Sequence, residues 1–367
     1  MRLLLLFAIL LCSVRLSAQH VFYGERPADK NDGALFFDKD GFPYPDYFIA
    51  DSSMANAYGS LFTWFMQNSG AFIEISASYQ LFPEKIDRET IFQLRDSITA
   101  GKIRSINRES YGYPAVAFYV HGFRKLYVSK TNEVTSAEEF RLLKANLATY
   151  GQPEAFGVEV YWDGMYDCCF SAKHSRNKEL FRLFETAAKN AQAVGLGLRT
   201  VLSGITNDHL QIISHSLGAQ VVASALFNRE ASTLPTPSQQ HIAICMLAPA
   251  IDGHTTFKSY HERQTTHNFS TADNYRLMIV YNEDDFVLLK KDPKTGMFGP
   301  GTKRYGETSL GCNYRNEAVK LERYFSEHYP NSTIRLLDKT SLGKAHSFRF
   351  YASGENLKEA SGFLWEL

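Results

Sequence analysis

The stretch Gln211-Ile212-Ile213-Ser214-His215-Ser216-Leu217-Gly218-Ala219 decides how this chain folds. It opens with apolar residues typical of a buried strand and then passes through small residues into a segment that favours a helix. Ser214 and Gly218, two positions before and two after Ser216, are small enough for a very tight strand-to-helix turn. Such a turn would expose the Ser216 hydroxyl above the end of the strand. Taken alone, the same residues also fit a serine that caps the start of a helix.

Short apolar segments alternate with helix-like segments on both sides of this turn, from residue 114 to the C-terminus. This alternation implies parallel strands joined by helical crossovers. We therefore expect one α/β domain over residues 114–367, with a mostly parallel central sheet flanked by helices. Ser136 and Glu139 have the spacing of a capping box, which predicts the start of one helix. Strands are predicted at 115–120, 156–162, 209–214, 242–247, 276–281 and 333–337, and helices at 136–150, 178–202 and 217–229.

Residues 1–19 have the features of a secretory signal peptide. A basic residue precedes an almost wholly apolar run at 3–12, and Leu16-Ser17-Ala18 offers a small-residue cleavage site. We expect cleavage near Ala18 or Gln19 and export to the periplasm or out of the cell. The apolar run is about half of the roughly 20 residues that a membrane span needs. No integral membrane segment is expected once the signal is removed.

Residues 20–113 are rich in aromatic residues and turn signals. Asp38-Lys39-Asp40-Gly41 lies between two apolar segments, 34–37 and 42–44, which is a hairpin pattern. The apolar stretch 71–75 predicts a further strand. We therefore expect an N-terminal β-rich extension over 20–113, packed against the main domain and without a catalytic residue of its own.

The charge and cysteine content argue against several classes of function. Lys+Arg and Asp+Glu number 39 each, so the chain lacks the positive field that concentrates nucleic acid or anionic lipid. Cys168, Cys169, Cys245 and Cys312 follow the signal segment in spacings that fit no zinc site. A disulfide is permitted in an oxidising compartment, and its pairing stays open. We expect no metal, no cofactor and no nucleic-acid partner.

A cluster of acidic residues follows the fifth predicted strand, within Asn282-Glu283-Asp284-Asp285-Phe286-Val287. An acidic loop is by itself most often solvated surface. If one of these carboxylates works with Ser216, Asp285 is the first choice and Asp284 is its alternative in the same loop. Asp252, which follows the preceding strand, is a third candidate.

Two more polar segments follow predicted strands. His346 lies just beyond the last strand, where an imidazole could take a proton from Ser216. His121-Gly122-Phe123 follows the first strand, and Gly122 would let the backbone approach closely. Each segment alone fits a surface histidine or an ordinary turn. Because open α/β sheets bind ligands at the carboxyl ends of their strands, we expect these segments to meet at one site.

Together these segments resemble the α/β-hydrolase superfamily, in particular small members of unassigned activity that carry His-Gly-Phe and His-Ser-x-Gly motifs. The turn at Ser216 resembles the nucleophile elbow Gly-x-Ser-x-Gly, from which Ser214 departs. The candidate serine, acid and histidine also occur in the chain order of that family. The resemblance extends from residue 114 to the C-terminus.

The resemblance implies a serine hydrolase that cleaves a carboxylic ester or a related acyl bond through an acyl-enzyme intermediate. Ser216 would be the nucleophile, His346 the base and Asp285 the acid that orients it. The backbone amides of Phe123 and Leu217 would form the oxyanion hole. The expected partner is a small-molecule or lipid-like ester. The alternatives are a serine peptidase, which would use the same triad, and a non-catalytic binding protein on the same fold.

Residues 287–331 separate the candidate acid from the candidate histidine. This segment includes a Gly/Pro-rich loop at 297–301, and its place in the sequence predicts that it forms part of the substrate pocket. Phe123 and nearby aromatic residues favour an apolar acyl pocket.

Overall fold

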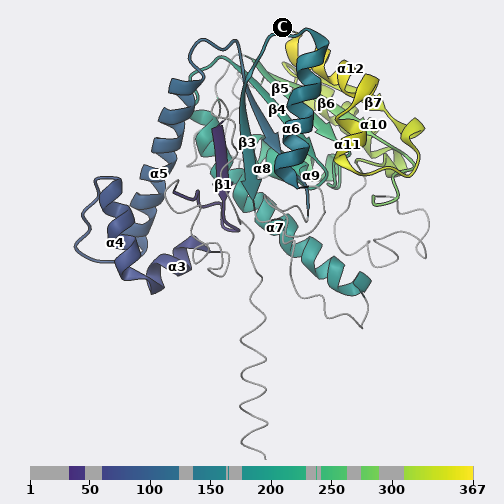
Figure 1. The fold of residues 1–367 in the computed structure, drawn as a ribbon. Helices are drawn as coiled ribbons and strands as arrows, with labels where there is room; N and C mark the ends of the chain where they lie inside the picture. The colour runs from purple at the N-terminus through teal and green to yellow at the C-terminus, as the bar shows by residue number, and fades with distance from the viewer. Residues whose placement is uncertain are drawn as a thin grey trace, which may run out of the picture.

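A seven-stranded sheet forms the centre of the protein, and all of its strands run parallel (Figure 1). The computed structural model describes residues 33–45, 60–123, 135–162, 164, 176–228, 237, 241–262, 274–288 and 310–366. The strand order is β1-β3-β2-β4-β5-β6-β7. The strands are β1 (Gly33–Phe37), β2 (Val116–Val120), β3 (Phe156–Trp162), β4 (His209–His215), β5 (His241–Leu247), β6 (Tyr275–Tyr281) and β7 (Thr333–Asp338).

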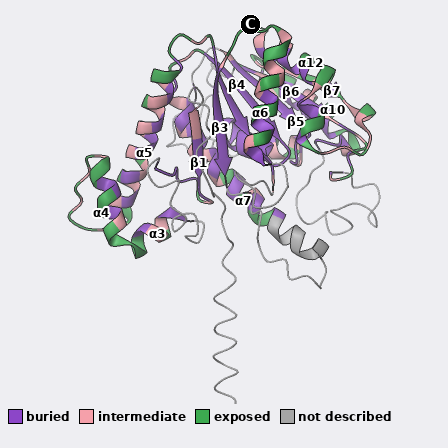
Figure 2. Ribbon diagram, in the orientation of Figure 1, coloured by how far each residue is buried: buried purple, intermediate pink, exposed green. Residues whose placement is uncertain are grey.

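The apolar segments that predicted strands after residue 114 all form strands of this sheet. Every position of β2, β3 and β4 is buried, as expected for strands that are covered on both faces (Figure 2). The predicted bounds of β3 are confirmed, and those of the other five predicted strands differ by one residue at one end. The predicted α/β fold with a parallel central sheet and flanking helices is therefore confirmed.

Helices form a layer on each face of the sheet. α7 packs against α5 and α8, and α9 packs against α8 and α10, so these helices share one layer. α6 packs against α11 and α12 on the other face, and Figure 1 shows α6 in front of the strands. The helices are α5 (Arg88–Glu109), α6 (Ser136–Leu147), α7 (Arg176–Ser203), α8 (Gly218–Phe227), α9 (His254–Glu262), α10 (Glu317–His328), α11 (Phe348–Tyr351) and α12 (Gly354–Trp365), with short 3-10 turns η2 (Ala148–Tyr150), η4 (Tyr314–Asn316) and η5 (Thr340–Leu342).

The direction of the chain across the sheet reverses at β2. From β2 the chain crosses to β3 on one side, and from β3 it crosses back past β2 to β4 on the other. Right-handed crossovers in opposite directions put α6 and α7 on opposite faces, so the carboxyl ends of β2 and β4 mark the switch point of the sheet, where α/β proteins bind ligands. Val120 pairs with Ser214 at that end, so the segments that follow the two strands lie next to each other.

The N-terminal region is not the β-rich extension that was expected. Its described residues, 33–45 and 60–113, contain one strand, β1, and three helices, α3 (Leu61–Gln67), α4 (Ser69–Ser78) and α5. The predicted strand at 71–75 lies inside α4. Phe72 and Ile75 are buried while Ile73 is 55 % exposed, so the apolar residues follow a helical period rather than the alternation of a strand.

The turn predicted at 38–41 is present, but only one side of the expected hairpin forms a strand. β1 pairs in parallel with β3, and the returning chain makes a single antiparallel bridge between Phe37 and Pro43. The buried Asp38 carboxylate accepts the N–H groups of Phe42 (2.8 Å) and Leu61 (2.6 Å), which ties this turn to the start of α3. Burial raises the pKa of Asp38 to about 7, although these backbone donors lower it.

The capping box of α6 begins one residue before the predicted position. Thr135 is the N-cap, and its partner in the box is Glu138 rather than Glu139. The sequence contains both a Thr-x-x-Glu and a Ser-x-x-Glu pattern here, and the earlier one caps the helix. Over the described residues, no helix combines the length and the apolar character that crossing a membrane requires. The predicted signal at 1–19 lies outside the described residues.

Candidate active site

Ser216 lies in the tight turn between β4 and α8. Its φ of +52° falls in the left-handed region, which is strained for a residue other than glycine. The N–H of Ser216 donates to Leu247 O (3.0 Å), and its carbonyl accepts the N–H of Ala250 (2.9 Å). The residue at the N-cap of α8 is Leu217, without a side-chain cap bond, so Ser216 is not a capping serine. The predicted strand–turn–helix geometry is confirmed.

Two glycines allow this turn to pack against the end of β2. A Cβ on Gly218 would lie 2.5 Å from His121 O, and a Cβ on Gly122 would lie 2.9 Å from Ser216 Cβ. Both distances are too short for real side chains, so the two backbones approach as closely as only glycine permits. Ser214, which stands where the resembled motif has glycine, is fully buried.

The side chains of Ser216, His346 and Asp285 form one hydrogen-bonded series. His346 Nε2 lies 3.1 Å from Ser216 Oγ, and His346 Nδ1 lies 2.7 Å from Asp285 Oδ2. An ionised carboxylate only accepts hydrogen bonds, so the neutral ring carries its proton on Nδ1 and leaves Nε2 to accept the Ser216 hydroxyl. This arrangement allows an imidazole to take a proton from a serine.

Of the three candidate acids, Asp285 is the one that His346 contacts. Asp284 is exposed, and its side chain has no bond to that ring among the described contacts. The Asp252 carboxylate instead accepts the hydroxyl of Thr255 at the start of α9. The choice of Asp285 among the three follows from the fold, because the turn after β6 directs its side chain inward.

The Asp285 carboxylate is fully buried and has several donors besides His346. Its Oδ1 accepts the N–H groups of Val287 (2.9 Å) and Leu288 (3.1 Å), and Tyr351 Oη lies 3.4 Å from its Oδ2. Burial, and then the nearby Asp285 charge, raise the pKa of Tyr351, so its hydroxyl stays protonated and can donate. These bonds hold the carboxylate in one orientation.

The loop that carries His346 is fastened to neighbouring strands by two buried side chains. Asn282 Nδ2 donates to the carbonyl oxygens of Gly343 (2.8 Å) and Ala345 (3.1 Å). The His215 ring donates from Nε2 to the carbonyl oxygen of His346 (2.9 Å), because a carbonyl can only accept. Sequence reasoning missed both residues as positioning groups. The polar Asn282 at the end of an apolar strand was the available signal.

His121 fixes the peptide that would supply one oxyanion donor. The N–H of Trp162 donates to His121 Nε2 (3.1 Å), so the neutral ring carries its proton on Nδ1. That Nδ1–H donates to the carbonyl oxygen of Gly122 (2.8 Å). In a trans peptide the N–H lies opposite the C=O, so the N–H of Phe123 points away from the His121 ring. Leu217, the other predicted donor, follows directly after the turn serine.

The described part of the segment 287–331 forms hydrogen bonds to the loops that follow β5 and β6. The N–H of Gly311 donates to Pro249 O (2.9 Å), and Gly311 O accepts the N–H of Asn282 (2.9 Å). A Cβ on Gly311 would lie 2.6 Å from the Ala248 carbonyl carbon, so these two hydrogen bonds also require a glycine at position 311. The predicted pocket loop at 297–301 lies outside the described residues.

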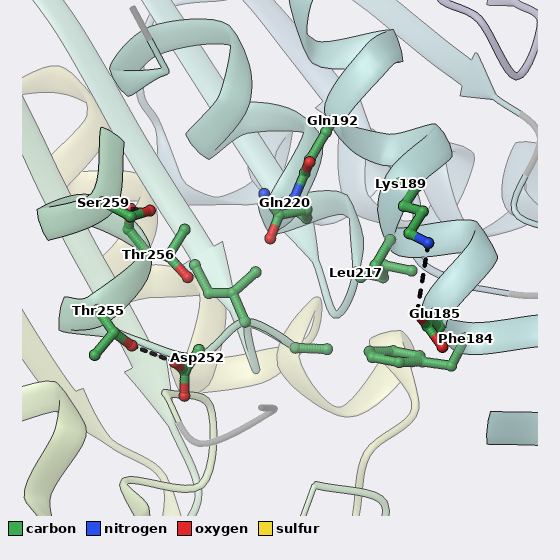
Figure 3. A pocket seen from close by; sticks show the side chains of 13 residues that line it. Phe184, Glu185, Lys189, Gln192, Leu217, Gln220, Asp252, Thr255, Thr256 and Ser259 are labelled. Carbon is green, nitrogen blue, oxygen red and sulfur yellow. Dashed lines mark hydrogen bonds and ion pairs between the residues drawn. The ribbon is translucent and has the colours of Figure 1, made fainter. Parts of the chain in front are cut away.

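A cavity of about 460 Å³ opens beside the site, between α7, α8, α9 and the loop after β5 (Figure 3). Leu217 and Ala250 form its inner end, next to Ser216. Phe184 adds an apolar wall and packs edge-to-face on Phe123 with ring centroids 5.5 Å apart. Ala188, Ile251, Asp252 and the polar side chains of the three helices line the remainder.

No protein-family model matches this chain, and no curated protein is significantly similar to it. The described residues hold no group of three or more His, Cys, Asp or Glu side chains that could bind a metal ion. Cys245 and Cys312 are buried, and the Cys312 thiol donates to Leu288 O (3.2 Å), whereas Cys168 and Cys169 lie outside the described residues. Function must therefore be inferred from the geometry around Ser216.

Proposed function

We propose that this protein is a serine hydrolase of the α/β-hydrolase superfamily that cleaves a carboxylic ester or a related acyl bond. The observation that carries the proposal is the series Ser216 Oγ to His346 Nε2 (3.1 Å) and His346 Nδ1 to Asp285 Oδ2 (2.7 Å). Its three members come from three separate loops at the carboxyl ends of parallel strands, where α/β enzymes place their chemistry. The strained φ of Ser216 adds support, because strain of this kind clusters at functional sites.

In the proposed first half-reaction, Ser216 Oγ attacks the carbonyl carbon of the ester while its proton passes to His346 Nε2. The resulting imidazolium is stabilised by the buried Asp285 carboxylate and then gives the proton to the leaving alcohol oxygen. The carbon–oxygen bond to the alcohol breaks, and the acyl group stays on Ser216. In the second half-reaction, water attacks this acyl-enzyme with His346 again as base, and the acid is released.

The negative charge that develops on the substrate oxygen needs preorganised donors. The N–H groups of Phe123 and Leu217 are the proposed donors. The bond from His121 to Gly122 O supports the first of them, since it holds the Gly122–Phe123 peptide in one orientation. The second donor is supported by the position of Leu217 at the start of α8, because the first backbone N–H groups of a helix have no partner within the helix.

The test is hydrolysis of a panel of 4-nitrophenyl esters and aminoacyl-peptide substrates by the purified protein. We expect ester hydrolysis that Ser216→Ala abolishes, with the variant still folded by circular dichroism. Ser214→Ala, which removes a buried hydroxyl two residues away, is the matched control and should remain active. Equal hydrolysis by wild type and Ser216→Ala would remove Ser216 from the mechanism. Cleavage of peptides but not of esters would identify a peptidase instead.

We also infer that the protein is exported, on the basis of the signal pattern at 1–19. Mass spectrometry of the mature protein from a periplasmic or culture-medium fraction should give an N-terminus at or next to Gln19. Recovery of the uncleaved chain in the cytoplasmic fraction alone would contradict this inference.

A further inference from the structure

The cavity beside Ser216 is lined by apolar and polar side chains together. Five of its lining residues are apolar (Phe184, Ala188, Leu217, Ala250 and Ile251), and the other eight are polar or charged. Figure 3 shows the amides of Gln192 and Gln220 on one side, Asp252 with Thr255 on another, and the Lys189–Glu185 pair on a third. These side chains come from α7, α8, α9 and the loop before α9. The ligand that suits this lining therefore has both a carbon skeleton and polar groups.

Two residues that adjoin the proposed nucleophile also line the cavity. Leu217 follows Ser216 in the chain, and Ala250 donates its N–H to Ser216 O (2.9 Å). Both residues line the cavity. His346 approaches Ser216 from the other face of the sheet, where His215 contacts Phe348 of α11. The cavity therefore lies next to the turn that carries Ser216, on the face opposite the histidine, where a group attached to the attacked carbonyl would be placed.

The charges of the cavity are nearly balanced. Lys189 Nζ lies 3.4 Å from Glu185 Oε1, and both side chains are largely exposed. Among the described residues that line the cavity, Asp252 carries the one charge outside this pair. From the described part of the chain, its carboxylate accepts one hydroxyl, that of Thr255, and so retains capacity to accept further hydrogen bonds.

The side chains around the cavity can both donate and accept hydrogen bonds. Asp252 offers acceptor oxygens, and Gln220 keeps its amide oxygen as an acceptor because its Nε2 donates to Tyr260 Oη (2.6 Å). Gln192 and Lys189 supply N–H donors. A hydroxyl group satisfies both kinds, because it donates and accepts. An alkyl chain satisfies neither and would strip water from these groups without replacing it. An ammonium group only donates, so it would leave the N–H donors without an acceptor.

We propose that this cavity binds a hydroxylated group of the substrate, and that Asp252 and Gln192 determine this specificity. The group belongs to the acyl part or to the alcohol part of the cleaved ester. Phe184 and Leu217 contact its carbon skeleton while the polar walls bind its hydroxyls. The inference rests on the proposed hydrolase function and adds the class of substrate to it.

Matched pairs of esters that differ by hydroxyl groups provide the test. In the acyl arm, 4-nitrophenyl 3-hydroxybutanoate is compared with 4-nitrophenyl butanoate. In the alcohol arm, glyceryl monoacetate is compared with propyl acetate. We expect kcat/KM to be about tenfold or more higher for the hydroxylated member of one pair, which identifies the part of the ester that enters the cavity.

Two variants then assign the selectivity to the cavity. Asp252→Asn and Gln192→Leu should each lower the ratio of kcat/KM between the two members of that pair by about tenfold, mainly through KM of the hydroxylated ester. The matched controls are Asp96→Asn and Gln93→Leu, exposed residues of α5 that do not line the cavity, and these should leave the ratio unchanged.

The outcomes separate this inference from the proposed function. If a fluorophosphonate labels Ser216 but both pairs favour the alkyl member, the cavity inference is overturned and the hydrolase function stands. A preference for an ammonium-bearing acyl ester, such as the 4-nitrophenyl ester of 4-aminobutanoate, over both hydroxylated esters also overturns it. Absence of labelling and of all hydrolysis overturns both proposals.

Discussion

The two sides of Ser216 are built differently. On the side of α11, His346 and Asp285 are held by buried partners, including Asn282 and Tyr351, each with hydrogen bonds at defined atoms. On the side of α7 and α9, the polar side chains that line the cavity are, apart from the buried Gln220, partly or largely exposed and have few bonds to one another. The comparison indicates that the residues proposed for catalysis are held in fixed positions, whereas the residues proposed for substrate selectivity keep free hydrogen-bonding capacity. Changes on the first side should lower turnover of every substrate, whereas changes on the second should depend on the substrate.

The largest effect within this comparison is expected from Asp285→Asn. The amide keeps the size of the side chain but favours the wrong tautomer of His346, so kcat should fall by about four orders of magnitude for all esters alike. Asp284→Asn, one residue away and exposed, is the control and should keep wild-type kcat. Steady-state kinetics measures both. A loss that follows Asp284 instead would overturn the assignment of the acid.

The next largest effect is expected from Gly122→Ala. The added Cβ would lie 2.9 Å from Ser216 Cβ and 3.0 Å from His215 O, so the strand-end loop must shift away from the nucleophile. We expect kcat to fall by about 100-fold or more, as for loss of one oxyanion donor. Gly70→Ala, where a Cβ meets nothing within 4 Å, is the matched control. Wild-type kcat in Gly122→Ala would show that this close approach is dispensable.

A smaller effect is expected from Tyr351→Phe. The variant removes one hydroxyl, 3.4 Å from Asp285 Oδ2 and 3.3 Å from Ala345 O, and leaves the other bonds of the acid in place. A hydrogen bond this long is weak, and its loss predicts a decrease in kcat of about fivefold, with KM unchanged. If the decrease depended on the ester used, Tyr351 would belong with the selective side rather than with the reactive side.

The smallest effect on activity is expected far from the site, at Asp38. Burial raises the pKa of Asp38 to about 7, so the folded protein binds this proton more tightly than the unfolded chain does. The protonated form therefore favours folding, and this contribution is lost as pH rises from about 4 through about 7. Thermal unfolding across this range should show a fall in Tm with pH that Asp38→Asn reduces, while kcat is unaffected. An identical slope in the variant would contradict the assignment.

The continuous apolar run at 115–120 made a central strand predictable, because such a run must be buried on both faces of the sheet where it pairs. The turn at Ser216 was predictable because Ser214 and Gly218 meet the size requirement of a tight turn between a strand pattern and a helix pattern. The stretch 71–75 misled because its apolar residues fit either a strand or a helix, and only the buried partners of Phe72 and Ile75 decide between them.

The supporting contacts of the site could not be predicted from sequence. His215 and Asn282 act through carbonyl groups about 60 or more positions away along the chain, and no local pattern encodes such a partner. The sequence favoured Asp285 as the acid but could not exclude Asp284, because the two neighbours differ only in the direction in which the turn points their side chains. The participation of β1 in the sheet also depends on a distant partner, β3.

The most direct measurement of the central claim is covalent labelling with a fluorophosphonate followed by peptide mass spectrometry. Displacement of fluoride by the activated hydroxyl should leave one phosphonyl group per chain, on Ser216. Labelling should be lost in Ser216→Ala and strongly slowed in His346→Ala. An adduct on another residue, or no adduct on a folded protein, would contradict the account of Ser216 as a nucleophile activated by His346.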